Sequence, residues 1–287
     1  MTATIDEPLV GLAQQADDVC ALPLVRRLSA TLDIDPSRWH EGDALPRGWH
    51  LAFFSVDTCQ ADLRGDGFAG LGVTLPNLGL PRIVFGGRNI RFIRDIPIGS
   101  KMKRVSKLTA VDRKEGRSGK FAVASIQHDT FIADDAEPAI VEIYNYVMRE
   151  AAKPAVPGAP AAAPPKPPSM PEPTHRKIVV PDEMLLFRVS AVMFNPHRIH
   201  YDLPYATDKE AYPSLVVNGS VTSLMLLEFF RSEAAVEPTS IVLRNAGLAY
   251  CRRPLRLNAV EGKNEWRVWA DDEEGNVVVE GTMGVTA

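Results

Sequence analysis

The stretch FNPHRIHYD at residues 194–202 places two histidines and an aspartate around a single proline. Between residues 195 and 208 lie several side chains that can handle protons or water, among them Asn195, His197, His200, Asp202, Tyr205 and Asp208. A histidine titrates near neutral pH unless its surroundings perturb it, so His200 can accept or give a proton. The amide of Asn195 can orient a water molecule, because it both donates and accepts hydrogen bonds.

A second short segment, NGS at residues 218–220, lies directly before a very apolar run. The spacing of the apolar residues predicts a helix over 219–235, with a wide apolar face. Backbone N–H groups of residues 218–220, aided by the start of that helix, could stabilise an oxyanion that develops during a reaction. The two segments together predict a base, a held water and an oxyanion site.

Plainer interpretations exist for each of these residues. His197 fits a structural role better than a chemical one, Asp202 can simply cap a turn, and Gly219 can simply begin a helix. A metal site is disfavoured, because His197 and His200 are three residues apart but no third ligand follows at a recognised spacing. A serine hydrolase is disfavoured by the lack of a GxSxG motif.

The elements that must position these residues are mostly strands. The run LLFRVSAVM at 185–193 is strand-like, and FAVASI and RVWA alternate as half-buried strands do. DEPLVGLAQQADDV at 6–19 is a modest helix candidate, so each half of the chain has one apolar helix followed by long strands. The order predicts an α+β fold with sheets wrapped around helices. No GxGxxG or GxxxxGK[ST] motif supports nucleotide binding.

Composition divides the chain into two parts. Residues 151–173 contain nine prolines and predict a semi-rigid linker between domains at 1–150 and 174–287. The net charge of −4 gives no support for a nucleic-acid partner, and no apolar run is long enough to span a membrane. Three dispersed cysteines fit neither a disulfide framework nor a zinc site, and the acidic N-terminus is unlike a signal peptide, so we expect a cytoplasmic protein.

The sequence resembles a known family at the residues singled out above. LFRVSAVMFNPHRIHYDLPYA followed by YPSLVVNGSVTSLMLLE resembles the MaoC-like hot-dog (R)-specific enoyl-thioester hydratases and dehydratases. The closer resemblance is to the FAS1-like dehydratase group, which includes mesaconyl-C4-CoA and itaconyl-CoA hydratases. GWHLAFF, LPRIVFGGRNIRF and DRKEGRSGKF resemble the first domain of that group, so the resemblance spans most of the chain.

The resemblance implies a double hot-dog fold, in which the second half is catalytic and the first half shapes the acyl tunnel. His200 matches the family's catalytic histidine, and Gly219 matches the glycine whose N–H polarises the thioester carbonyl. Asn195 falls where the broader motif D-x-N-P-x-H has an aspartate, although the closer group often has asparagine there. The usual His-Gly-Pro is here Asn218, Gly219 and Ser220, from which we expect altered substrate choice or reduced activity.

These assignments predict the reversible hydration of an enoyl thioester. His200 would deprotonate the water that Asn195 holds, with Asp202 or a backbone carbonyl orienting the imidazole, and Gly219 N–H would stabilise the enolate. No metal or redox cofactor is required, with CoA present as part of the substrate. An acyl-CoA thioesterase and a non-catalytic acyl-binding subunit on the same fold remain alternatives.

The substrate is expected to be an acyl-CoA, with a C5 dicarboxylyl-CoA suggested by family analogy. The basic cluster Arg252, Arg253 and Arg256 could meet CoA phosphates, or could equally be solvated at a strand edge. Arg198 could pair with a second carboxylate, or could anchor the loop. The residues expected to contact substrate are Arg198, Tyr205, Val217, Asn218, Ser220 and Arg253. We also expect a homodimer, because hot-dog proteins commonly pair.

Overall fold

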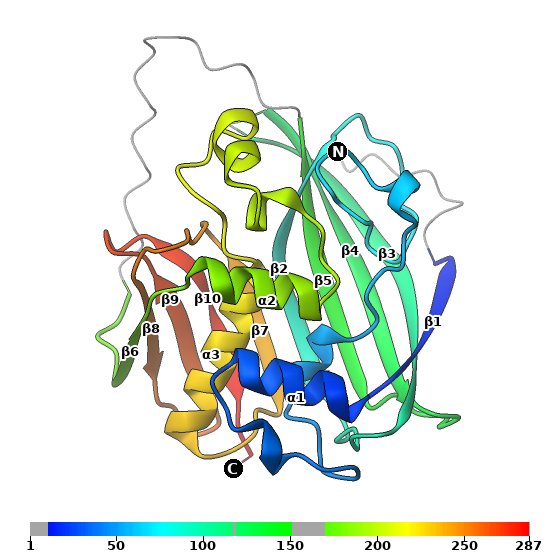
Figure 1. Cartoon of the computed structure of the whole chain (residues 1–287), viewed down its shortest axis with the longest axis vertical. Helices are drawn as coiled ribbons and strands as arrows, with labels where there is room; N and C mark the ends of the chain where they lie inside the picture. Colours follow the sequence, from blue (N-terminus) through cyan, green and yellow to red (C-terminus); the bar gives the residue numbers. More distant parts are fainter. Residues whose placement is uncertain (1–10, 117–118, 151–169, 287) are drawn as a thin grey trace.

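The computed structural model describes residues 11–116, 119–150 and 170–286, and in these it contains one antiparallel sheet of ten strands (Figure 1). The predicted linker at 151–173 lies outside the described residues except for its last four positions. The strands are β1 (Ala13–Val19), β2 (Arg82–Phe92), β3 (Lys101–Gly116), β4 (Gly119–Ile132), β5 (Ile140–Arg149), β6 (His175–Val179), β7 (Ser240–Asn245), β8 (Leu255–Val260), β9 (Glu265–Asp271) and β10 (Val277–Gly284).

The order of the strands reflects the two halves of the sequence. The sheet runs β1-β3-β4-β5-β2-β7-β10-β9-β8-β6, so each half contributes five neighbouring strands. The halves meet where β2 pairs with β7, from Gly87 opposite Arg244 to Arg91 opposite Ser240. A continuous backbone ladder therefore joins the first half to the half that carries the predicted site.

The alternation of buried and partly exposed side chains explains why these segments form strands. In β4 the side chains of Ala122, Ala124 and Ile126 are fully buried, and their neighbours are only partly so. Residues with this period of two place one face on the core and the other toward solvent. The predicted strands FAVASI and RVWA lie in β4 and β9, as expected.

The predicted central helix of the second half is α3 (Gly219–Ala234), which lies in the curve of the strands β7 to β10 (Figure 1). Half of its side chains are buried, including Leu224, Phe229 and Phe230. It begins at an Asn218 cap, whose Oδ1 accepts from Ser220 N–H, and ends at Ala235, which has a positive φ of 55°. Such caps satisfy groups that the helix itself leaves unpaired.

Two predicted elements were wrong. The run at 185–193 is not a strand but part of α2 (Glu183–Val192), since Asp182 caps its start by accepting from Leu185 N–H at 2.8 Å. The helix candidate at 6–19 contains the edge strand β1 instead, whose backbone pairs with β3 and whose burial alternates. Residues 6–10 of that candidate lie outside the described part of the chain.

The helix of the first half is α1 (Leu22–Thr31), which packs beside α2 (Figure 1). Short helical turns follow it at η1 (Pro36–Arg38), η2 (Trp49–Ala52) and η3 (Gln60–Asp62). In place of a long helix, apolar side chains of residues 71–80 cover β3 and β4. Loops therefore cover part of the inner face of this half, and one of its buried polar side chains, Arg88, reaches Ser220 at the start of α3.

Candidate active site

The loop that follows α2 carries the two histidines, and its shape is set by Phe194 and Asn195. Phe194 adopts a positive φ of 49°, which ends the helix and turns the chain. Asn195 Oδ1 then accepts a hydrogen bond from His197 N–H at 3.1 Å, a local turn that asparagine favours. One lone pair of the Asn195 amide is thus committed to the backbone, and the remaining groups of that amide stay available for a water.

His200 lies in the single turn η4 (Arg198–His200) and is buried, with 6% of its surface exposed. Its Nδ1 lies 2.7 Å from the carbonyl oxygen of Val216. A carbonyl can only accept, so Nδ1–H is the donor and Nε2 carries the free lone pair of the neutral ring. Burial lowers the pKa of His200 to about 4, partly opposed by the bond to Val216, so the ring is neutral at pH 7 and can act as a base.

Gly219 begins α3 three residues after Val216. Its N–H belongs to the first turn, where no acceptor exists within the helix, and it lies at the positive end of the helix dipole. The next N–H, that of Ser220, is already used by Asn218 Oδ1 at 2.8 Å. Gly219 N–H is therefore the donor best suited to meet a ligand oxygen.

A short backbone segment that begins at Val216 connects the carbonyl that binds His200 to the donor at Gly219. Val216 forms an isolated β-bridge with Tyr250, and Val217 N–H donates to Ala249 O at 2.9 Å. Val216 faces His200 with its carbonyl, and the chain reaches Gly219 only three residues later. Sequence reasoning placed these residues together by family resemblance, and this backbone segment is what joins them.

Asp202 does not orient the imidazole. Its Oδ2 pairs with Arg198 at 2.8 Å and its Oδ1 accepts from Tyr205 N–H at 3.1 Å. The pairing follows from sequence spacing, because residues four apart meet across one turn. Of the two orienting groups considered from the sequence, the backbone carbonyl, that of Val216, is the one in place.

Arg198 and Tyr205, both predicted to contact the substrate, interact with other groups of the chain instead. Arg198 also donates to Gly65 O at 3.2 Å, and its guanidinium stacks over the Tyr205 ring at 4.0 Å. Tyr205 O–H donates to Glu210 at 3.1 Å. Arg198 therefore anchors the loop, which is the plainer of its two interpretations.

Comparison with known proteins places the chain in a family. A family model described as hydroxyacyl-thioester dehydratase type 2 matches residues 48–251, more than half of the chain. A protein of Chloroflexus aurantiacus named mesaconyl-C(4)-CoA hydratase is 33% identical over 278 residues, covering 96% of this chain and 95% of that protein. The chain belongs to the hydroxyacyl-thioester dehydratase type 2 family.

Solved structures agree on the fold. A MaoC-like dehydratase of Phytophthora capsici superposes with a TM-score of 0.70 at 14% identity, with 99% of each chain covered. A Mycobacterium tuberculosis protein described as having a double hotdog fold superposes with a TM-score of 0.54 at 13% identity, with 96% of each chain covered. The predicted α+β double hot-dog is confirmed. With this fold and family, the chain is a hydro-lyase that hydrates and dehydrates acyl thioesters.

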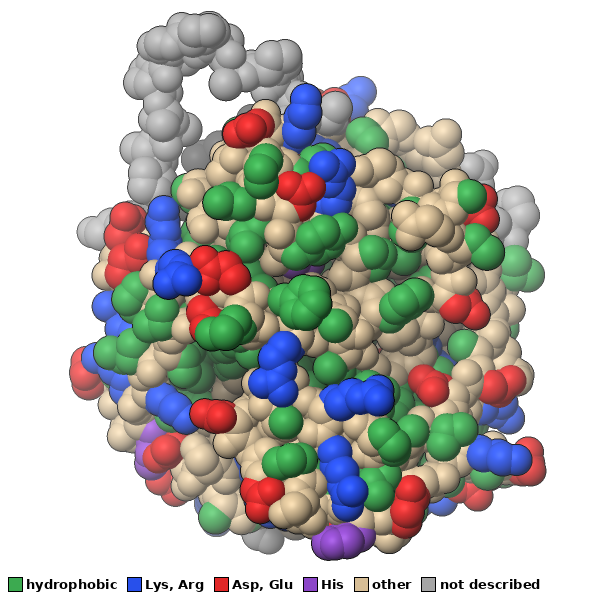
Figure 2. All heavy atoms as spheres, viewed as in Figure 1, with side chains coloured by type: hydrophobic (Ala, Val, Ile, Leu, Met, Phe, Trp, Pro, Cys, Tyr) green, Lys and Arg blue, Asp and Glu red, His purple; other side chains and the backbone are tan. Residues whose placement is uncertain are grey.

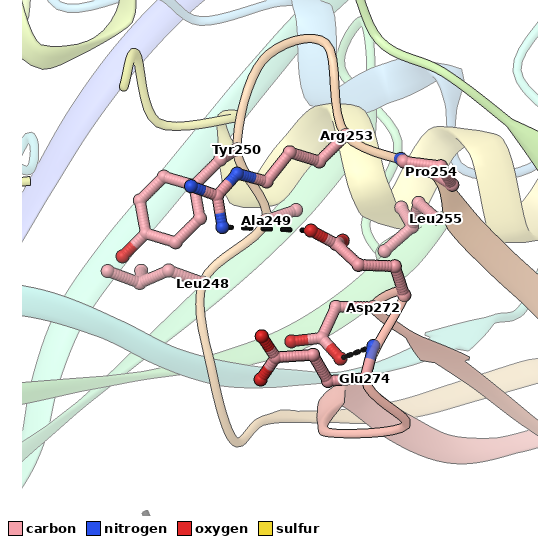
Figure 3. Close-up of a pocket in the computed structure, with 9 residues that line it drawn as sticks. Leu248, Ala249, Tyr250, Arg253, Pro254, Leu255, Asp272 and Glu274 are labelled. Carbon is pink, nitrogen blue, oxygen red and sulfur yellow. Dashed lines mark hydrogen bonds and ion pairs between the residues drawn. The ribbon is translucent and has the colours of Figure 1, made fainter. Parts of the chain in front are cut away.

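The three arginines that were expected to meet the phosphates of CoA are paired with carboxylates in the structure. Arg252 pairs with Glu183 at 2.7 Å, Arg253 with Glu273 at 3.7 Å and Arg256 with Asp271 at 2.7 Å. Arg253 lies over the Tyr250 ring at the edge of a cavity of about 170 Å³ (Figure 3). That cavity is also lined by Asp272, Glu273 and Glu274, so carboxylates compete there with any phosphate.

Two features of this dehydratase escaped the sequence reasoning. A first-half loop packs on the histidine loop: Asp66 O accepts from Arg198 N–H at 2.9 Å, and a Cβ at Gly67 would lie 1.9 Å from Pro196 O. The pair of glycines in RGDG was the available signal. The other is Arg88, a buried arginine of β2 whose Nη2 lies 3.3 Å from Ser220 Oγ. Nothing in the sequence links residues 132 positions apart.

None of the described helices is long and apolar enough to cross a membrane. Among the residues that the structure describes, no group of three or more His, Cys, Asp or Glu side chains has the geometry of a metal site.

Proposed function

We propose that His200 and Gly219 catalyse the reversible hydration of a short enoyl-CoA. The observation that carries this proposal is the hydrogen bond from His200 Nδ1–H to Val216 O, 2.7 Å long. It leaves Nε2 as an unprotonated base, and the same backbone segment continues into the donor at Gly219. General bases typically contribute about 10²–10⁴ in rate and an oxyanion donor a similar factor.

The reaction proceeds by addition of water across the conjugated double bond. Nε2 of His200 takes a proton from a water held by the Asn195 amide, and the water oxygen bonds to the β-carbon. The electron pair of the double bond moves toward the thioester carbonyl, and Gly219 N–H stabilises the resulting enolate oxygen. The imidazolium so formed is the acid that returns a proton to the α-carbon, and the reverse sequence dehydrates a 3-hydroxyacyl thioester.

For the acyl group, we propose a C5 dicarboxylyl-CoA such as mesaconyl-C4-CoA or itaconyl-CoA. The support is the 33% identity to the protein named mesaconyl-C(4)-CoA hydratase over nearly the whole of both chains. Val217, Asn218 and Ser220 would line the acyl group, since they flank the proposed oxyanion donor. The paired state of Arg252 and Arg253 makes them weaker candidates for CoA phosphates than the sequence suggested.

The remaining proposals concern cofactors, assembly and location. No cofactor is needed, because the base and the oxyanion donor both come from the chain and CoA arrives with the substrate. A homodimer is supported by the exposed apolar side chains Met184, Phe187 and Phe194 on and just after α2. Hydrophobic side chains also gather near α2 on the face shown in Figure 2. A location in the cytoplasm is supported by the three cysteines, which are all free. Light scattering of the purified protein measures the assembly directly.

A panel of enoyl-CoA esters tests the proposed reaction. A hydratase removes the ultraviolet absorbance of the conjugated thioester without releasing free thiol. Thiol release would instead indicate a thioesterase, and no change with any ester would indicate a binding subunit. The panel should include mesaconyl-C4-CoA, itaconyl-CoA and crotonyl-CoA, so that a dicarboxylyl group and an uncharged one are compared.

A further inference from the structure

Arg88 is a buried cation with unused hydrogen-bond donors. Its residue is 3% exposed, and its Nη2 donates to Ser220 Oγ at 3.3 Å. Its Nε and Nη1 are buried without a hydrogen-bond partner among the described residues. Burying such donors unpaired is costly, so they are normally matched by an acceptor.

The charge around Arg88 is not balanced by a direct ion pair. Among the described residues no carboxylate lies within 4 Å of its guanidinium. Glu142, on the neighbouring strand β5, instead accepts from His50 at 3.0 Å. Arg104 lies on the same inner face of the sheet, donates to Phe54 O and leaves its own Nε unpaired. This wall therefore has an excess of guanidinium groups over carboxylates.

Aromatic rings fix the orientation of the guanidinium. Its carbon lies 4.7 Å from the centre of the Phe85 ring and 5.0 Å from that of Tyr144. Rings packed on an arginine leave the edge of its planar fork for hydrogen bonding. The fork is adjacent to the start of α3, since Phe85 Cδ1 lies 3.3 Å from the position of a Cβ at Gly219.

We propose that Arg88 binds a carboxylate carried by the acyl group of the substrate, and so selects short dicarboxylyl thioesters over uncharged ones. The inference rests on the proposed function, because a thioester carbonyl at Gly219 N–H places the acyl carbons beside Ser220 and Arg88. A carboxylate a few bonds from the carbonyl then meets the unpaired edge of the guanidinium, where a two-point hydrogen bond is geometrically favoured.

Pairing with a second carboxylate of the substrate, which was one of the two interpretations of Arg198, is the role that Arg88 takes. The Arg198 side chain is 39% exposed and is engaged by Asp202 and Gly65. Arg88 is buried, and its Nε and Nη1 have no hydrogen-bond partner among the described residues. A buried, oriented cation discriminates between a charged and an uncharged ligand more strongly than an exposed, paired one.

The first test compares two substrates that differ only in one substituent of the β-carbon. Mesaconyl-C4-CoA and 3-methylcrotonyl-CoA differ in having a carboxylate or a methyl group on the β-carbon. Arg88→Gln should lower kcat/KM for the former by about 30-fold or more, as truncating a buried charge pair does, and leave the latter no worse. Arg91→Gln, on the exposed face of the same strand, is the matched control, and Arg88→Lys should restore part of the loss. Equal losses on both substrates in a folded Arg88→Gln protein would overturn the proposal.

The second test measures binding and does not depend on turnover. Calorimetry at 4 °C compares succinyl-CoA with butyryl-CoA, two saturated thioesters that cannot be hydrated. The wild-type protein should bind succinyl-CoA more tightly, and Arg88→Gln should remove that preference. A wild-type protein without the preference would refute the role of Arg88 even if hydratase activity were found. A preference that depends on Arg88 would support it even if none of the enoyl-CoA esters were hydrated.

Discussion

His200 Nδ1 and the carbonyl oxygen of Val216 lie 2.7 Å apart, inside a buried site. Because the carbonyl cannot donate, this one contact fixes the tautomer of the imidazole and directs its free lone pair away from the backbone. Val216 belongs to the segment that leads into α3, so one short stretch of backbone connects the partner of the base to the helix start.

The low pKa of His200 predicts how stability depends on pH. The pKa is about 4 in the folded protein, because burial disfavours the charged ring, against about 6.5 for an unperturbed histidine. Between these values the unfolded chain binds more protons than the folded one, so the free energy of unfolding falls as pH decreases from 6.5 toward 4. Glu142, with a pKa of about 2, contributes at lower pH only.

Urea unfolding at pH 7 and pH 5 measures this effect. Wild-type protein should lose stability at pH 5, and His200→Gln, which cannot take up the proton, should lose less. His128, whose pKa burial also lowers to about 4, supplies a second such group that both proteins share. An equal loss in the two proteins would show that His200 is not held neutral in the folded state.

Gly219→Ala should slow the reaction without preventing folding. An added Cβ would lie 3.2 Å from Asn245 Nδ2 and 3.3 Å from Phe85 Cδ1, so the start of α3 must shift by a few tenths of an ångström. Misplaced donors lower rates by up to about 10²-fold. Steady-state rates of Gly219→Ala, and of Gly219→Ala with Asn245→Ala, measure the effect. The second change should restore part of the rate, and a full rate in the single variant would contradict the assigned position.

Gly67→Ala should displace the first-half loop from the histidine loop. Gly67 has a φ of +82°, and a Cβ there would lie 1.9 Å from Pro196 O, a backbone atom that cannot rotate away. We expect lower activity, and stability reduced by about 1–3 kcal/mol from backbone strain and the displaced contact. Gly42→Ala is the matched control, because its φ is +90° with nothing within 4 Å of the added Cβ. If the two variants behave alike, the contact with Pro196 has no role.

Asn218 should act mainly as a helix cap. Its Oδ1 accepts from Ser220 N–H at 2.8 Å, so Asn218→Ala should cost about 1 kcal/mol in the free energy of unfolding. Asn218→Asp keeps the acceptor and should retain most of that stability. Urea unfolding of the two variants distinguishes a cap from a simple packing residue, for which both changes would have similar effects.

Much of the second half could be predicted from its sequence. The helix at Gly219 was predicted to within a residue, because the glycine and the wide apolar face that follows it indicate the same start. The run at 185–193 misled because its aromatic and β-branched residues suit a strand, while the deciding cap at Asp182 lies before it. The Arg198–Asp202 pair was visible at a spacing of four, but only the structure shows that it excludes Asp202 from the imidazole.

The residues that the first half contributes to the candidate site could not be predicted in the same way. Arg88 meets Ser220 across 132 residues, and Asp66 meets Arg198 by a similar long-range contact. Such contacts depend on how β2 and β7 pair and on how loops fill the inner face of the sheet. No local spacing or composition signal carries that information.

Whether Nε2 of His200 is the base can be measured with a single variant, His200→Ala. The variant should remain folded, by circular dichroism and thermal unfolding, and hydrate its best enoyl-CoA about 10²–10⁴-fold more slowly than wild type. His40→Ala, with a side chain 69% exposed and outside the site, serves as the control and should keep the wild-type rate. A folded His200→Ala protein with unchanged turnover would contradict the account.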